Sequence, residues 1–349
     1  MAVKFQKTVR KGVLLSPLKG FDPDTRTYEY RFDPLTGRST TIAVGTFEYV
    51  KKFLVTDGAM LKALIEKTRP ICPFCPESLE KLTPKFPSDL VSDGRIRVGE
   101  AVAFPSLFGH AEHSIVVVLT GEHYLNLDAF KPELLENGFK GALSCLQEIA
   151  GKTQNVEHAS ILMNYLPPAG SSLPHPHIQL LAREHPFYSA KVLIEKADEY
   201  FKAYRSNYWD DLVEAERKVE ERYLGKLGSV EWLLPFAPLH SLLEVRAIVP
   251  RKSNLLQLKD DDLKGLSDGV VRVLKFYFDQ GVSSFNFALL SSSLRKRLES
   301  FSVNLTMNAR TGIQPTCFSD AWALPYILQD GYSPELPETI AQKLKPYFG

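Results

Sequence analysis

The stretch NYLPPAGSSLPHPHIQLLA, residues 164–182, carries the most distinctive chemical pattern in the chain. His175, His177 and Gln179 are spaced two residues apart, and this spacing predicts that their side chains share one face of a β-strand. A Pro-Pro-Ala-Gly turn and two serines come just before, and they offer the backbone and hydroxyl donors that hold phosphate. The pattern favours a nucleophile, a metal ligand and a donor to a phosphoryl oxygen. The alternative is a solvated strand with incidental histidines.

A second pattern is the CxxC pair formed by Cys72 and Cys75. Such a pair is a zinc half-site, a redox pair or a chance occurrence. Five prolines between residues 70 and 87 favour a loop here, rather than the strand and helix that flank a thioredoxin-like pair. A zinc site would need two further ligands, and the candidates are the histidines at other positions: His110, His113, His123, His158, His175, His185 and His240.

The chain also contains an internal repeat of about 130 residues. Residues 100–123 and 231–252 both begin with Glu and an apolar run, pass through Phe and Pro to Leu and His, and end in a β-branched strand. Each is followed by a helical apolar pattern, at 134–150 and 260–278, and then by two predicted strands. We therefore expect a pseudo-symmetric pair of α+β units whose sheets could join.

We expect the first unit to span residues 1–187 and the second 188–349, with one or two surface helices at 188–227 linking the copies. Trp209 and Tyr223 in this link are expected to be packing residues. The second copy places Val303 or Asn304, Leu305 and Thr306 where the first has its histidines and glutamine. Only the N-terminal unit would therefore supply a nucleophile.

These residues resemble the active-site motif of the galactose-1-phosphate uridylyltransferase branch of the histidine triad superfamily. The matching positions are Asn164, Gly170, Ser172, His175, Pro176, His177 and Gln179. The run RFDPLTG at 31–37, a turn between two predicted strands, is also similar to the N-terminal signature of that family. The resemblance implies an α+β fold built from a duplicated histidine-triad-like unit, with antiparallel sheets and helices packed on them.

The resemblance also implies one structural zinc ion. Its ligands would be Cys72, Cys75, His123 and His175, with His113 as the competitor to His123 because it begins the same predicted strand. Zinc would tether the N-terminal loop to the catalytic strand and fix His175, which leaves His177 free.

By the same resemblance, His177 is the nucleophile of a nucleotidyl transfer, and Gln179 and Ser172 hold the phosphoryl oxygens. The other nitrogen of the His177 ring is expected to donate to a backbone carbonyl. Substrate contacts are expected from a further set of residues: Asn164, Gly170, Ser171 and Phe104. The substrates would be a nucleotide sugar and a sugar 1-phosphate, as in galactose metabolism, and the protein would be a homodimer.

The chain departs from the family pattern in ways that leave two other functions open. Residues 102–105 read VAFP without the expected Asn, the Arg after the first hairpin is missing, and no histidine follows His240. A phosphorylase of a nucleoside diphosphate sugar or a dinucleoside polyphosphate would use inorganic phosphate as the acceptor. A zinc-tethered binding module without activity is the third possibility.

Composition limits the class of protein further. A net charge of +1 over 349 residues argues against nucleic-acid binding. No apolar run approaches the roughly 18 residues of a membrane helix, and the N-terminus lacks the apolar stretch of a secretory signal. Four cysteines in a chain of this length suggest no disulfide framework, so we expect a reducing, cytoplasmic location.

Overall fold

The computed structural model describes residues 3–240, 242–316 and 318–349. A ten-stranded sheet, antiparallel throughout, forms its centre. In spatial order its strands are β4 (Ile96–Val98), β5 (Ala101–Pro105), β6 (His113–Val118), β8 (His177–Arg183), β7 (His158–Tyr165), β12 (Phe285–Leu290), β13 (Val303–Ala309), β11 (Val245–Val249), β10 (Val230–Leu233) and β9 (Tyr223–Leu227).

The two halves of this sheet have the same internal order. The first runs β4-β5-β6-β8-β7, the second runs β9-β10-β11-β13-β12, and they meet where β7 pairs with β12. One long helix separates the third and fourth strands of each half along the chain: α4 (Pro132–Lys152) and α7 (Asp260–Asp279). The α+β class and the joining of two similar sheets are therefore confirmed, and both helices were predicted within two residues of their ends.

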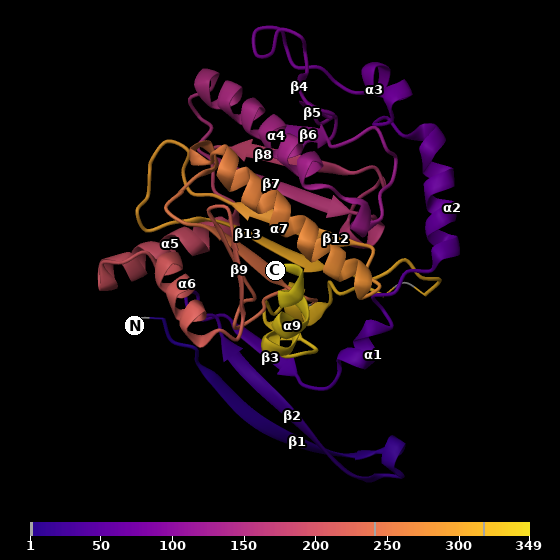
Figure 1. The fold of residues 1–349 in the computed structure, drawn as a ribbon, viewed down its shortest axis with the longest axis vertical. Helices are drawn as coiled ribbons and strands as arrows, with labels where there is room; N and C mark the ends of the chain where they lie inside the picture. Colours follow the sequence, from indigo (N-terminus) through magenta and orange to yellow (C-terminus); the bar gives the residue numbers. More distant parts are fainter. Residues whose placement is uncertain (1–2, 241, 317) are drawn as a thin grey trace.

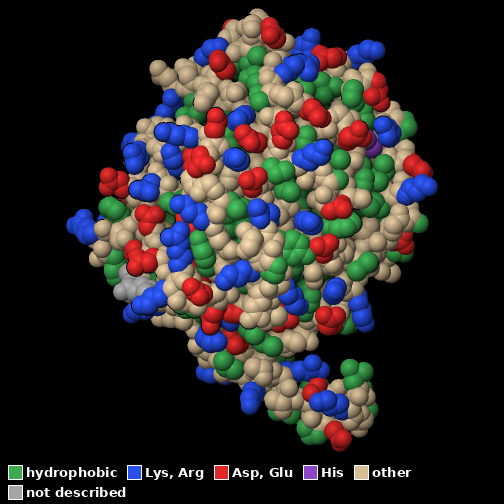
Figure 2. All heavy atoms as spheres, in the orientation of Figure 1, with side chains coloured by type: hydrophobic (Ala, Val, Ile, Leu, Met, Phe, Trp, Pro, Cys, Tyr) green, Lys and Arg blue, Asp and Glu red, His purple; other side chains and the backbone are tan. Residues whose placement is uncertain are grey.

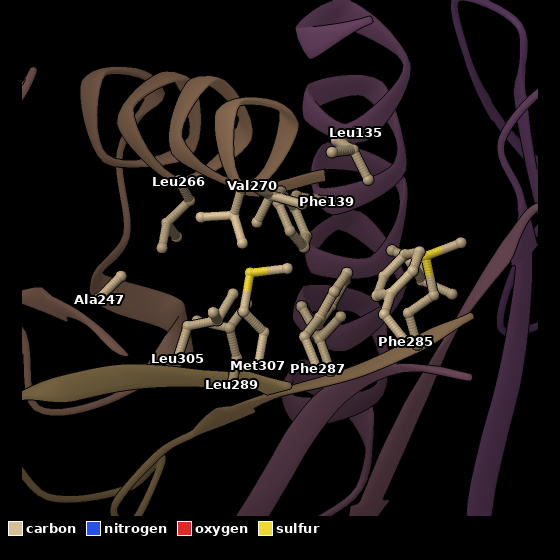
Figure 3. Packing of buried hydrophobic residues seen from close by; sticks show 14 of the residues in the cluster. Leu135, Phe139, Ala247, Leu266, Val270, Phe285, Phe287, Leu289, Leu305 and Met307 are labelled. Carbon is tan, nitrogen blue, oxygen red and sulfur yellow. The ribbon is translucent and has the colours of Figure 1, made fainter. Parts of the chain in front are cut away.

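Helices α4 and α7 pack against each other and cover one face of the sheet (Figure 1). Their inner faces bury the main apolar core against inward-facing residues of the central strands (Figure 3). At Gly138 of α4 and Gly269 of α7 the helix lies very close to the sheet side of the core, since a Cβ there would lie 2.2 Å from Leu119 and 2.1 Å from Trp232. The packing is therefore too tight for a side chain at either position.

Near both of its ends, the opposite face of the sheet is covered by other segments of the chain. At one end, Phe74 and Leu79 of the segment that contains the CxxC pair pack on β5 and β6. At the other end lie α5 (Tyr188–Tyr204) and α6 (Tyr208–Val219), and Trp209 is buried against β10 and β11 as predicted. The helices of the predicted link end at Val219. Tyr223 lies beyond them in β9, which pairs with β10 at the edge of the second half of the sheet.

A small four-stranded sheet brings the two ends of the chain together. Its order is β1 (Lys7–Ser16), β2 (Asp22–Phe32), β3 (Ser39–Ala43) and β14 (Gly331–Ser333), with β14 parallel to β3. The 31–37 run makes the predicted turn, in which Asp33 accepts from Leu35 N and Thr36 N. The proposed units 1–187 and 188–349 therefore share this sheet, and the division between them stays a prediction.

The hairpin of β1 and β2 projects from the body as an arm with apolar side chains near its tip (Figures 1 and 2). The remaining helices are shorter: α1 (Phe47–Lys51), α2 (Gly58–Thr68), α3 (Pro76–Leu82), α8 (Ala323–Tyr326) and α9 (Pro337–Leu344), of which α9 packs Ile340, Ala341 and Leu344 into the main core. Among the described residues, no helix combines the length and the apolar character needed to cross a bilayer.

Candidate active site and metal centre

Four buried side chains gather where the CxxC loop meets the sheet. They are Cys72, Cys75, His123 and His175, and their sulfur and nitrogen atoms all lie within 4.8 Å of one another. Cys72 Sγ lies 3.6 Å from His175 Nδ1, and Cys75 Sγ lies 3.4 Å from His123 Nδ1. Tetrahedral zinc with its usual bond lengths would hold such atoms about 3.3 to 3.8 Å apart. The cluster therefore fits a metal ion.

The bonds outside this cluster leave the correct nitrogens free to bind a metal. His175 Nε2 must donate to the carbonyl of Thr120, 2.8 Å away, so its Nδ1 carries the lone pair. Thr68 Oγ1 donates to Leu64 O and so accepts from His123 Nε2, which leaves Nδ1 of His123 unprotonated. Burial lowers the pKa of His175 to about 4, and the ring is therefore neutral at physiological pH.

The backbone brings three distant segments to this point. Cys72 follows a 3-10 turn at Arg69–Ile71, and Cys75 immediately precedes α3, where Pro76 occupies the first helical position. His123 comes five residues after β6, and His175 comes two residues before β8. His113 pairs with Ala182, five positions along the sheet from the pair Val118–His177, or roughly 17 Å away. The structure therefore places His123 in the cluster and excludes His113.

His177 is half-buried, and its ring has one tautomer that fits its surroundings. Nδ1 lies 2.8 Å from the carbonyl of His175, so it must donate, and Nε2 then carries the free electron pair. Burial lowers the pKa of His177, which keeps the ring neutral. This hydrogen bond to a backbone carbonyl confirms the predicted orientation and leaves Nε2 available for nucleophilic attack.

The expectation that His175 belongs to the same strand as His177 and Gln179 is wrong. Strand β8 begins at His177, because the prolines on either side of His175 have no N–H to donate to a neighbouring strand. His175 lies just before the strand and contacts the two cysteines, whose loop packs on the same side of the sheet as His177 and Gln179, opposite α4 and α7.

The loop between β7 and β8 places the predicted phosphate-binding groups near this face. Asn164 lies near the end of β7, two residues beyond Leu162, the partner of Gln179. Gly170 follows the 3-10 turn Pro167–Ala169 with φ 89°, a left-handed conformation that favours glycine. Of the two serines, Ser171 is buried and donates to Leu173 O, whereas Ser172 is exposed.

Phe74 is a neighbour of His177 that the sequence analysis did not identify. Its ring centroid lies 5.1 Å from that of His177 and 5.8 Å from that of Phe104. Phe104 is 1% exposed and packs beneath Phe74 with Val102, Val116 and Val118. A direct contact between Phe104 and a substrate therefore stays a prediction. The position of Phe74 between the two cysteines of the CxxC pair was the available signal, because burial of both cysteines in one cluster fixes the residues between them.

No family model matches the chain. A curated relative, an uncharacterized protein of Archaeoglobus fulgidus, is 29% identical over 345 residues, which is 98% of each chain.

Three solved structures share the fold over 91% of this chain. A GalT-like protein of Arabidopsis thaliana has a TM-score of 0.69 at 16% identity over 98% of its length. An ADP-glucose phosphorylase of the same plant, solved with bound ADP-glucose, gives the same values. A mutant uridylyltransferase has a TM-score of 0.65 at 17% identity over 97% of its length. The chain therefore has the duplicated α+β fold of GalT-like proteins and uridylyltransferases, as its sequence led us to expect.

Proposed function

We propose that the protein is a nucleotidyltransferase that moves a nucleoside monophosphate from a nucleotide sugar to a hexose 1-phosphate. The observation that carries this proposal is the tautomer of His177, whose Nε2 is free because Nδ1 donates to His175 O. The fold shared with a uridylyltransferase and with an ADP-glucose phosphorylase solved with ADP-glucose supports a nucleotide sugar as the donor.

In the proposed reaction, Nε2 of His177 attacks the α-phosphorus of the nucleotide sugar. The bond from that phosphorus to the bridging oxygen breaks, and the sugar 1-phosphate leaves with the electron pair. Gln179 and the Gly170–Ser172 loop would donate to the non-bridging oxygens. An oxygen of the acceptor phosphate then attacks the same phosphorus, the N–P bond breaks, and His177 returns to its neutral form.

We assign the buried Cys2His2 cluster to a structural zinc ion. Cys72, Cys75, His123 and His175 would hold it, and the ion would supply a rigid link between the CxxC loop and the segment before β8. With all four positions taken by protein ligands, none is left for a substrate. The chemistry would therefore rest on His177 and its neighbours.

A phosphorylase that uses inorganic phosphate as the acceptor is the second candidate. The observation that favours it is the lack of the family's Asn in the run 102–105 and of any histidine after His240 in the second copy, where the residues that handle a hexose were expected. A binding module without activity is less well supported, because its function would not require the free Nε2 of His177. The expected homodimer stays a prediction.

The choice of acceptor is tested on the loaded protein. We would incubate it with UDP-glucose or ADP-glucose, remove the excess, and measure by intact mass how fast the adduct is lost to galactose 1-phosphate, to inorganic phosphate and to water. A transferase discharges fastest to the hexose phosphate, because sugar contacts hold the acceptor in line. A phosphorylase discharges fastest to phosphate. Discharge to water at the same rate as to either acceptor would contradict both.

A further inference from the structure

A row of polar side chains crosses the seam between the two halves of the sheet and ends at Asn164. Asn286 on β12 is the direct partner of Asn164 on β7, and its Nδ2 lies 2.6 Å from Asn164 Oδ1 and 2.9 Å from Ala169 O. On its other side, Asn286 Oδ1 lies 2.6 Å from Nη1 of Arg310. Asp320, 8% exposed, holds the guanidinium of Arg310 through contacts of 2.6 to 2.9 Å.

The chemistry of these groups fixes the direction of every hydrogen bond in the row. A guanidinium can only donate, so the atom of Asn286 that faces Arg310 must be its oxygen. A carbonyl can only accept, so the atom that faces Ala169 must be the nitrogen of the same amide. Both ends therefore require the same orientation of Asn286, which donates to Oδ1 of Asn164.

This orientation has a consequence for Asn164. Its oxygen is engaged by Asn286, so its Nδ2 is the side of the amide directed away from the seam. Asn164 lies on the sheet face that also carries Gln179 and His177, and the same Asn286 amide holds the turn that leads to Gly170. A donor fixed in advance stabilises a developing negative charge more strongly than a group that must first reorient.

We propose that Asn286 and Arg310, both from the second half of the chain, are positioning residues that turn the Asn164 amide so that it donates to the phosphoryl group. The inference rests on the proposed function and extends it. The second half, which carries no nucleophile, sets the polarity of a donor in the first. Arg310 acts through Asn286, and Asp320 acts by holding Arg310.

The test is the substitution Asn286→Asp, which keeps the shape and turns the donor into an acceptor. The new carboxylate would face Asn164 Oδ1 and Ala169 O, so Asn164 would have to rotate and direct its oxygen at the phosphate. At saturating nucleotide sugar we expect the rate of adduct formation to fall about a hundredfold, as on loss of an oxyanion donor. Asn308→Asp is the matched control, since Asn308 pairs with Asn286 but its side chain donates to Ala309 O. Its rate should stay within about threefold of wild type.

Two further measurements separate positioning from a merely structural role. In an Asn164→Ala background no amide remains to be misoriented, so Asn286→Asp should change the rate by less than about threefold. Arg310→Lys keeps a donor toward Asn286 and should retain more activity than Arg310→Met at matched melting temperature. Equal losses from Asn286→Asp in both backgrounds, or a wild-type rate in the single variant, would overturn the proposal.

The affinity for UMP and AMP, measured by calorimetry on the same variants, tests the positioning role without requiring that a nucleotidyl adduct forms. Weaker binding in Asn286→Asp but not in Asn308→Asp would support the positioning of Asn164 by Asn286 even if wild type formed no adduct. In that case only the proposed function would fail. Unchanged binding together with unchanged adduct formation would refute the positioning role of Asn286, and the proposed function would be unaffected.

Discussion

Removal of metal from the Cys2His2 cluster should cost the protein several kcal/mol of stability. The contact between Cys75 and His123 spans 48 residues, and that between Cys75 and His175 spans 100. Treated as a single cross-link, a loop of this length changes the free energy of unfolding by about 4 to 5 kcal/mol. For a chain of 349 residues this corresponds to a fall in melting temperature of roughly 6 °C.

The assay is calorimetric melting of protein reconstituted with zinc, before and after a chelator, together with metal analysis. We expect one zinc per chain and a chelator-dependent fall in wild type. Cys72→Ser should melt lower from the start and should not respond to the chelator. Cys145 is a buried free cysteine on α4, outside the cluster, so Cys145→Ser should be destabilised yet keep the full chelator response. Failure to bind zinc, or unchanged melting after complete removal of bound zinc, would refute the assignment.

Three further predictions concern other parts of the molecule. Gln179→His should speed discharge of the adduct to water by at least about tenfold, measured by intact mass, because an imidazole can activate water where an amide cannot. Burial alone would raise the pKa of Glu244, but His240 and other neighbouring charges lower it to about 2. Its stabilising effect is therefore present above pH 4.5 and lost as the pH falls toward 2, so Glu244→Gln should flatten the acid limb of a stability profile. Gly269→Ala would place a Cβ 2.1 Å from the buried Trp232 and should cost about 1 to 3 kcal/mol in urea unfolding.

Each of these three predictions has a control variant or a result that would contradict it. Gly151→Ala, also in a helix but with no atom within 4 Å of its Cβ, should stabilise by up to about 1 kcal/mol. Equal effects at the two glycines would contradict the packing argument. An unchanged acid limb in Glu244→Gln, or discharge to water no faster in Gln179→His, would refute the other two.

The sequence predicts the fold and most of the candidate site, because the residues of that site occur in short local motifs. The spacing of the two cysteines and of the His-Pro-His run is local, and the repeat in the chain predicted two sheets that join. The choice of His123 over His113 came only from the resemblance, since which end of an apolar strand faces the CxxC loop depends on tertiary packing.

Asn286 and Arg310 could not have been found from spacing. They approach Asn164 only because β12 pairs with β7 in one particular register, with more than a hundred residues between them along the chain. A shift of that register by one residue would turn Asn286 to the helical face. Phe74 is different, because its position between the two cysteines was visible, and only the packing of the CxxC loop against the sheet makes it a neighbour of His177.

The central claim is that His177 forms a covalent bond to a nucleotide, and peptide mass spectrometry tests it directly. The protein would be incubated with UDP-glucose or ADP-glucose, digested at neutral to mild alkaline pH, and searched for an added nucleoside monophosphate. We predict an acid-labile modification on His177, absent from His177→Ala and retained in His185→Ala, where an exposed histidine outside the site is removed. Turnover without any adduct, or an adduct that persists in His177→Ala, would contradict the account.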